Sequence, residues 1–193
     1  MAHPARTTQS GAGPSDAALV VSAMAGEGWA QEALYRRYAR LVNGLAFRLM
    51  PNRADASDLA QDVFVQAFQS LPRLKNRDAL SSWLSAIVVR TAHKRIRRQR
   101  LMRRLGLLRT EPVDLDTVVS RTAPPDAAAE ARAVYAVIET LPAEDRMALV
   151  LRRIEGMAIA EIAEQLDRSV ATVKRRLASA EARLFERLGE YDA

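Results

Sequence analysis

Hydrophobic residues recur at helical spacing from Ala17 to the end of the chain, and no convincing stretch alternates with a period of two. This spacing places the apolar side chains on one face of a helix. The pattern predicts helices at 17–25, 29–50, 55–71, 83–104, 128–140, 142–156, 158–166 and 170–188. Asp55 is expected to cap the third of these helices, and Ser81 or Ser82 to cap the fourth. The chain is therefore expected to be all-α.

Two segments interrupt the helical pattern. Residues 1–16 are rich in Ala, Gly, Ser, Thr and Pro, and they are expected to form a disordered tail. Residues 105–127 contain Pro112, Pro124 and Pro125 together with acidic residues. Because structureless segments of this length are uncommon inside one compact domain, this segment is predicted to be a flexible linker. We therefore expect two small helical domains, at 17–104 and 128–190.

The segment at 83–104 has an apolar face and a basic face. The apolar positions are Leu84, Ile87, Val88, Thr91, Ala92 and Ile96. The other face carries Arg90, Lys94, Arg95, Arg97, Arg98, Arg100, Arg103 and Arg104, with no acidic residue among them. A face that meets only solvent is the alternative, but such faces normally mix signs because like charges four residues apart repel. The helix is therefore predicted to bind a polyanion.

The net positive charge of the chain lies in its first half. The net charge is +6, and the isoelectric point is about 10.3, which favours nucleic acid or an anionic membrane surface as a partner. Residues 1–100 carry 15 Lys/Arg and 7 Asp/Glu, a balance of +8. The remaining residues carry 14 and 16, a balance of −2. Nucleic-acid binding by the second half therefore requires a local basic patch.

Residues 157–184 fit a helix-turn-helix motif, which provides such a patch. The apolar positions of its two helices are Ile159, Ile162, Ala163 and Leu166, then Val173, Leu177, Ala180 and Leu184. Ser169 is placed to cap the second helix, and Arg168, Lys174, Arg175 and Arg176 lie near its start. Any tight helical hairpin gives the same apolar pattern. The basic cluster favours DNA binding, with the start of the second helix in the major groove.

Several classes of function are disfavoured by what the sequence lacks. There is no cysteine, and His3 and His93 have no partner at metal-ligand spacing. No phosphate loop, nucleophile elbow or Ser/His/Asp set occurs, so we expect no cofactor and no catalysis. No apolar run approaches the roughly 20 residues of a membrane span, and the N-terminal residues lack the apolar core of a signal peptide. The protein is expected to be cytoplasmic.

Five segments taken together resemble a known family. They are ALYRRYARLV, ADASDLAQDVFVQAF, SSWLSAIVVRTAHKRIRR, LPAEDRMALVLRRIEGMAIAEIAEQL and VATVKRRLASAEARL. In this order they resemble the bacterial sigma factors of the extracytoplasmic-function type, over about residues 20–188. The resemblance implies that the first domain is sigma region 2 and the second is sigma region 4. It also implies core RNA polymerase and promoter DNA as partners, and the family commonly has an anti-sigma factor.

The resemblance implies three binding surfaces. The polymerase would bind Asp58, Gln61, Asp62, Val65 and Gln69. The minus-ten element would contact a base-capturing loop and the basic helix, through Lys75, Asn76, Arg77, Ser81, Ser82, Trp83, Arg90, Lys94, Arg97 and Arg98. The minus-thirty-five element would contact Arg168, Ser169, Ala171, Thr172, Lys174, Arg175 and Arg176. The turn, which usually carries Gly in the family, has Asp167 here, a residue type that can adopt a left-handed conformation.

Two other functions remain as alternatives. A stand-alone helix-turn-helix regulator would bind DNA without polymerase, and the face of Asp58 to Gln69 would then have no partner. A basic adaptor on a membrane surface would bind anionic vesicles and no specific duplex, which the helix-turn-helix argues against.

Overall fold

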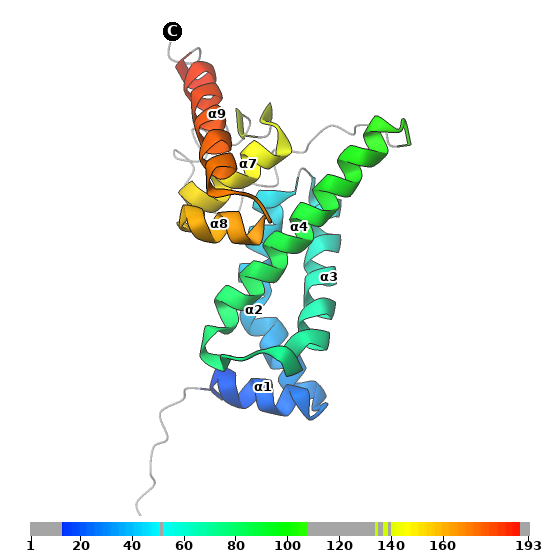
Figure 1. Ribbon diagram of the computed structural model, residues 1–193. Coiled ribbons are helices and arrows are strands. Elements are labelled where there is room, and N and C mark those ends of the chain that lie inside the picture. The colour runs from blue at the N-terminus through cyan, green and yellow to red at the C-terminus, as the bar shows by residue number, and fades with distance from the viewer. Residues whose placement is uncertain (1–12, 51, 108–133, 135–136, 139, 190–193) are drawn as a thin grey trace, which may run out of the picture.

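The computed structural model describes residues 13–50, 52–107, 134, 137–138 and 140–189, and within them it contains helices and no strand. The α-helices are α1 (Asp16–Met24), α2 (Gly28–Leu49), α3 (Arg53–Ser70), α4 (Leu80–Arg104), α7 (Ala143–Leu149), α8 (Ile159–Gln165) and α9 (Val170–Gly189) (Figure 1). Short 3-10 turns at Leu71–Arg73 and Arg77–Ala79 connect α3 to α4, and a π-helical turn at Val150–Ile154 continues α7. The all-α prediction is confirmed.

Parts of the predicted tail, linker and fifth helix lie outside the described residues. The tail prediction included Asp16, but this residue begins α1, and Ser15 caps the helix by accepting a hydrogen bond from the Ala18 amide. Of the predicted linker, only residues 105–107 are described. They end α4, where Gly106 at φ 72° accompanies a bond from the Leu107 amide to the Met102 carbonyl. Of the helix predicted at 128–140, residues 134, 137, 138 and 140 are described, and all are helical.

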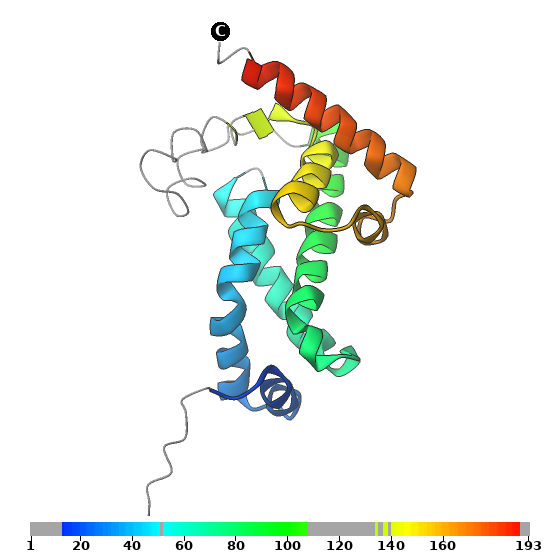
Figure 2. The same cartoon turned by 90° about the vertical axis from the view of Figure 1, so that its left-hand side faces the viewer.

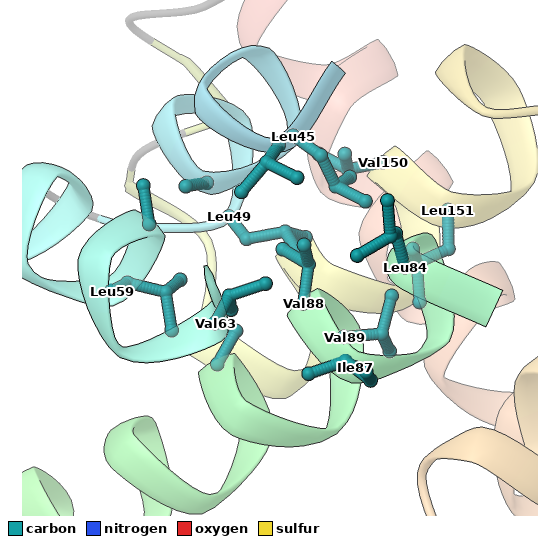
Figure 3. Packing of buried hydrophobic residues seen from close by; sticks show 14 of the residues in the cluster. Leu45, Leu49, Leu59, Val63, Leu84, Ile87, Val88, Val89, Val150 and Leu151 are labelled. Atoms are coloured by element: carbon teal, nitrogen blue, oxygen red, sulfur yellow. The ribbon is translucent and has the colours of Figure 1, made fainter. Parts of the chain in front are cut away.

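The first half is a bundle in which α2, α3 and α4 pack lengthwise, while α1 lies across one end (Figure 1). Its fully buried side chains include Leu45, Leu49, Leu59, Val63 and Val88 (Figure 3). The apolar stripe predicted for α4 is buried, apart from Thr91, which is half-buried. Val89 is also fully buried, although it lies outside that stripe. A second surface must therefore cover another side of α4.

That second surface belongs to the other half of the chain. The buried apolar residues of both halves form one continuous cluster, in which Val150 and Leu151 approach the first bundle (Figure 3). The two views place α8 beside α4 (Figures 1 and 2). Arg48 at the end of α2 binds Glu155, with Nε at 2.7 Å from Oε1. The sequence predicted two domains but did not predict this contact between them.

The starts of α3 and α4 differ from the sequence prediction. Asn52 caps α3, accepting a hydrogen bond from the Asp55 amide at 2.8 Å, so the proposed cap at Asp55 is wrong. Helix α4 begins at Leu80, and Ser81 and Ser82 lie in its first turn rather than capping it. The Leu80 side chain is buried in the core, and the helix begins there, three residues before its expected start at Trp83.

Replacing Asn52 with alanine is expected to lower the free energy of unfolding by about 1 kcal/mol, because the first turn of α3 loses a hydrogen-bond acceptor. Thermal unfolding followed by circular dichroism measures the change. Asn52→Ser preserves an acceptor and serves as the control, with a loss of only a few tenths of a kcal/mol. Equal losses for the two variants would show that the cap does not stabilise this helix.

Candidate nucleic-acid and protein interfaces

The outer face of α3 presents a mixed polar and apolar surface. All five residues predicted to bind polymerase are exposed, namely Asp58, Gln61, Asp62, Val65 and Gln69. Val65 is 51% exposed, which is high for a valine in a well-packed helical bundle. Helical spacing places the five on one stripe, so the fold brings this predicted set together.

A groove of about 430 Å³ runs along one flank of this stripe, between α2 and α3. Its lining is Tyr35, Asn43, Ser57, Ala60, Gln61, Phe64, Val65 and Phe68. The rings of Tyr35 and Phe64 lie 4.6 Å apart, and Tyr35 is 47% exposed. Exposed aromatic and aliphatic groups with amide and hydroxyl neighbours are typical of a protein-binding surface. Tyr35 was not predicted from the sequence, because its spacing on α2 alone does not show which helix lies opposite.

On the other flank of the stripe, Arg95 of α4 reaches across to α3. Its Nη2 lies 3.2 Å from Asp58 Oδ2 and 3.6 Å from Asp55 Oδ1, and its Nη1 lies 3.8 Å from Asp62 Oδ2. Asp58 and Asp62 are 64% and 61% exposed, so each of these pairs contributes about 0–1 kcal/mol. Two of the predicted polymerase-binding acids therefore contact the basic helix directly.

The basic face of α4 is a solvent-exposed stripe. Arg90, Lys94, Arg97 and Arg98 are exposed and follow helical spacing. The loop residues predicted to capture a base lie at the start of the same helix, where Lys75, Asn76, Arg77, Ser81 and Ser82 are exposed. Trp83 is half-buried and packs against the core. The predicted minus-ten residues thus lie on the loop before α4 and along α4 itself. All of them are exposed except Trp83, part of whose side chain packs against the core.

The second half contains the predicted helix-turn-helix. Helix α8 and helix α9 flank a turn in which Asp167 has φ 51°, as its left-handed role requires. The Ser169 hydroxyl accepts a hydrogen bond from the Thr172 amide at 3.2 Å, so the predicted cap is confirmed. Ala171, Lys174 and Arg175 are exposed at the start of α9.

Two arginines of the predicted minus-thirty-five set lie close to acidic residues of α7. Arg176 binds Glu144 through Nη2, and its Nη1 lies 2.9 Å from Asp145 Oδ1. Arg168 Nη2 lies 3.9 Å from Glu144 Oε1, and Arg100 of α4 approaches the same atom at 3.8 Å. Glu144 therefore lies close to arginines from both of the elements that are predicted to bind DNA.

His93 of α4 faces this charged cluster. Burial lowers the pKa of His93, and the positive charges of Arg168, Arg97 and Arg176 lower it further, while Glu144 acts in the opposite direction. The folded protein therefore favours the neutral imidazole. Since the unfolded chain takes up this proton at a higher pH, protonation favours the unfolded state.

Acidification from about pH 7.5 to 5.5 is expected to reduce stability through His93. The loss begins near the ordinary histidine pKa of about 6.5 and is complete below the lower pKa of the folded protein. His93→Gln should flatten this part of the profile, measured as the unfolding temperature at each pH. His3→Gln is the control, and an equal flattening by that variant would contradict the assignment.

Two other kinds of site are absent from the described part of the chain. It contains no group of three or more His, Cys, Asp or Glu residues that could hold a metal ion. None of its helices combines the length and the apolar character needed to cross a membrane.

Comparison with known proteins gives matches to both halves. Residues 34–102 match Sigma-70 region 2, and residues 131–184 match Sigma-70, region 4. The ECF RNA polymerase sigma factor SigM of Mycobacterium tuberculosis is 35% identical over 176 residues, which cover 91% of this chain and 85% of SigM. The ECF RNA polymerase sigma-E factor of Escherichia coli is 29% identical, covering 84% of this chain and 88% of that protein.

Solved structures show the same fold. The sigma factor RpoE from Bartonella quintana, in complex with the anti-sigma factor NepR, gives a TM-score of 0.63 at 19% identity, covering 82% of this chain and 96% of RpoE. CnrH, in complex with the cytosolic domain of CnrY, gives a TM-score of 0.56 at 24% identity, covering 92% of this chain and 99% of CnrH.

Proposed function

The chain belongs to the ECF RNA polymerase sigma factors, and we propose that it docks on core polymerase through the outer face of α3 and directs it to promoters. The observation that carries this proposal is the exposed stripe Asp58–Gln69 beside the groove lined by Tyr35 and Phe64. A protein that only bound DNA would gain nothing from exposed acidic and apolar side chains in this position, since acids repel phosphates.

Promoter recognition is divided between the two halves. In the first half, the loop of Lys75 to Arg77 captures a splayed base of the minus-ten element, while Arg90, Lys94, Arg97 and Arg98 neutralise nearby phosphates. In the second half, the start of α9 enters the major groove of the minus-thirty-five element. Arg175 is the best-placed reader of base edges there, because its side chain is exposed and no acid holds it in the described structure.

The proposal also covers organisation and place of action. The boundaries are region 2 at 17–104, a linker at 105–127 and region 4 at 128–190. The function is recognition without catalysis, as is general for sigma factors. The proposed regulator is an anti-sigma factor, the class of protein that is bound to RpoE in its solved complex with NepR. Polymerase and promoters are cytoplasmic in bacteria, so the protein would act in the cytoplasm.

In-vitro transcription on a library of random promoters tests the proposal. Core polymerase alone, the protein alone and the two together are compared, and the transcripts are sequenced. We expect specific transcripts only from the combination, with sequence preferences in two blocks upstream of each start. Specific duplex binding by the protein without any effect on transcription would instead favour the stand-alone regulator.

A further inference from the structure

A seam of polar side chains joins α3 to α4. Thr91, Arg95 and Gln99 follow one another at single-turn spacing on α4 and all face α3. The Thr91 hydroxyl donates to Gln66 Oε1 at 3.3 Å, and Gln99 Nε2 donates to Asp55 Oδ2 at 2.9 Å. Arg95, between them, is the only charged member on the α4 side of this seam. It therefore responds most strongly to any change in the charge of α3.

The three carboxylates around Arg95 differ in their exposure and partners. Asp55 is mostly buried and has Gln99 as a second partner, and its backbone carbonyl also accepts a bond from Arg95 Nη1 at 3.4 Å. Asp58 and Asp62 are exposed and belong to the proposed docking face. A cationic side chain arriving from solvent can therefore bind these two carboxylates while Asp55 continues to hold the seam together.

Arg95 lies at the edge of the DNA-binding stripe. It follows Lys94 directly and is about 60° of helix rotation from Arg98, given 3.6 residues per turn. Its side chain is 25% exposed, so it is partly open to solvent. Because an arginine side chain is long and has many rotamers, we expect that a change of rotamer can turn it from α3 toward a phosphate bound by Lys94 or Arg98.

We propose that Arg95 is a positioning residue that couples the docking face to the DNA-binding helix, which rests on the function proposed above. In the free protein, Asp58 and Asp62 hold its guanidinium on α3. Basic groups of polymerase compete for the same carboxylates, and Arg95 then adds a positive charge to the stripe of α4. Binding of polymerase thereby strengthens the contact with DNA without a change in the backbone.

The full-length free protein permits a test that needs no polymerase. Asp58→Asn with Asp62→Asn imitates occupied docking acids, and it is made with Arg95 present and with Arg95→Gln. A matched control, Glu32→Gln with Glu181→Gln, also neutralises two acids and releases Arg36 and Arg153, their partners at 2.6 Å. The probe is a fluorescein-labelled 30-base-pair duplex of random sequence, titrated over a range of salt concentrations, with thermal unfolding to verify the fold.

With Arg95 present, neutralisation of Asp58 and Asp62 should tighten binding roughly tenfold more than the control at about 50 mM salt, and should steepen the salt dependence by about 0.9. With Arg95→Gln, the same neutralisation should match the control, and Arg95→Lys should restore part of the gain. If DNA binding tightened equally in the Arg95→Gln background, the change in net charge alone would explain the effect, and the proposed coupling through Arg95 would be wrong. Core binding by the wild-type protein is measured separately, so loss of the docking function is distinguishable from loss of the coupling.

Discussion

Replacing both Asp58 and Asp62 with lysine is expected to weaken binding to core polymerase about 100-fold, which corresponds to about 3 kcal/mol. Promoter-specific transcription should fall to the level of core alone at ordinary protein concentrations. The physical reason is the reversal of the two exposed negative charges of the proposed docking stripe. Both side chains are exposed, and Asp55 keeps its hydrogen bond from Gln99 between α3 and α4, so the bundle should stay folded.

The control for this double reversal is Glu181→Lys with Glu186→Lys on α9. These side chains also lie at the surface, and the change in net charge is identical. Affinity for core is measured by fluorescence anisotropy, and folding by circular dichroism. Unaltered promoter-specific transcription by the Asp58 and Asp62 variant would remove the main support for docking through α3.

Arg175→Ala is expected to reduce binding to a promoter's minus-thirty-five element by about 1–3 kcal/mol, roughly 5- to 150-fold, while affinity for core polymerase is unchanged. Arg175 is exposed at the start of α9, where an arginine can reach the edge of guanine. The measurement is holoenzyme binding to duplexes with and without the element selected from the library. Arg183→Ala, farther along the exposed side of α9, is the control.

The comparison between sequences decides the role of Arg175. A loss confined to the selected element identifies a base contact, whereas an equal loss on all duplexes identifies a phosphate contact only. Arg176→Ala should behave differently from both. Because Arg176 binds Glu144 and the buried Asp145, its removal leaves a buried acid with fewer partners and should lower the unfolding temperature.

The helices and their buried stripes could be predicted from the sequence, because helical spacing is a local property. The sequence was also sufficient for the turn, where Asp167 and Ser169 act through neighbouring backbone. The start of α4 could not be predicted, because it depends on Leu80, which is buried in the core and begins the helix before the expected position. A cap within three residues was also misassigned, since Asn52 and Asp55 are both good capping residues.

The main features missed are contacts between segments distant in sequence. Arg48 and Glu155 are 107 positions apart, and no periodicity relates them. Arg95 and its acids are separated by about 40 positions, so a face that appeared wholly basic is partly neutralised by α3. The ion pairs of Arg176 were missed for the same reason: its acidic partners lie on α7, which the local pattern of α9 does not reveal.

The contact between the halves has a consequence for competition among sigma factors inside a cell. The two halves share one buried apolar cluster, and Arg48 binds Glu155 across the contact. If the complex with polymerase and promoter requires the halves to separate, only the separated form is competent, and the apparent dissociation constant for polymerase rises as the competent fraction falls. A competent fraction of about one in a hundred would raise it about 100-fold. At low copy number, the protein would then bind little of a limited amount of polymerase, and other sigma factors would bind most of it. Only at high copy number would this protein occupy a large share of the polymerase.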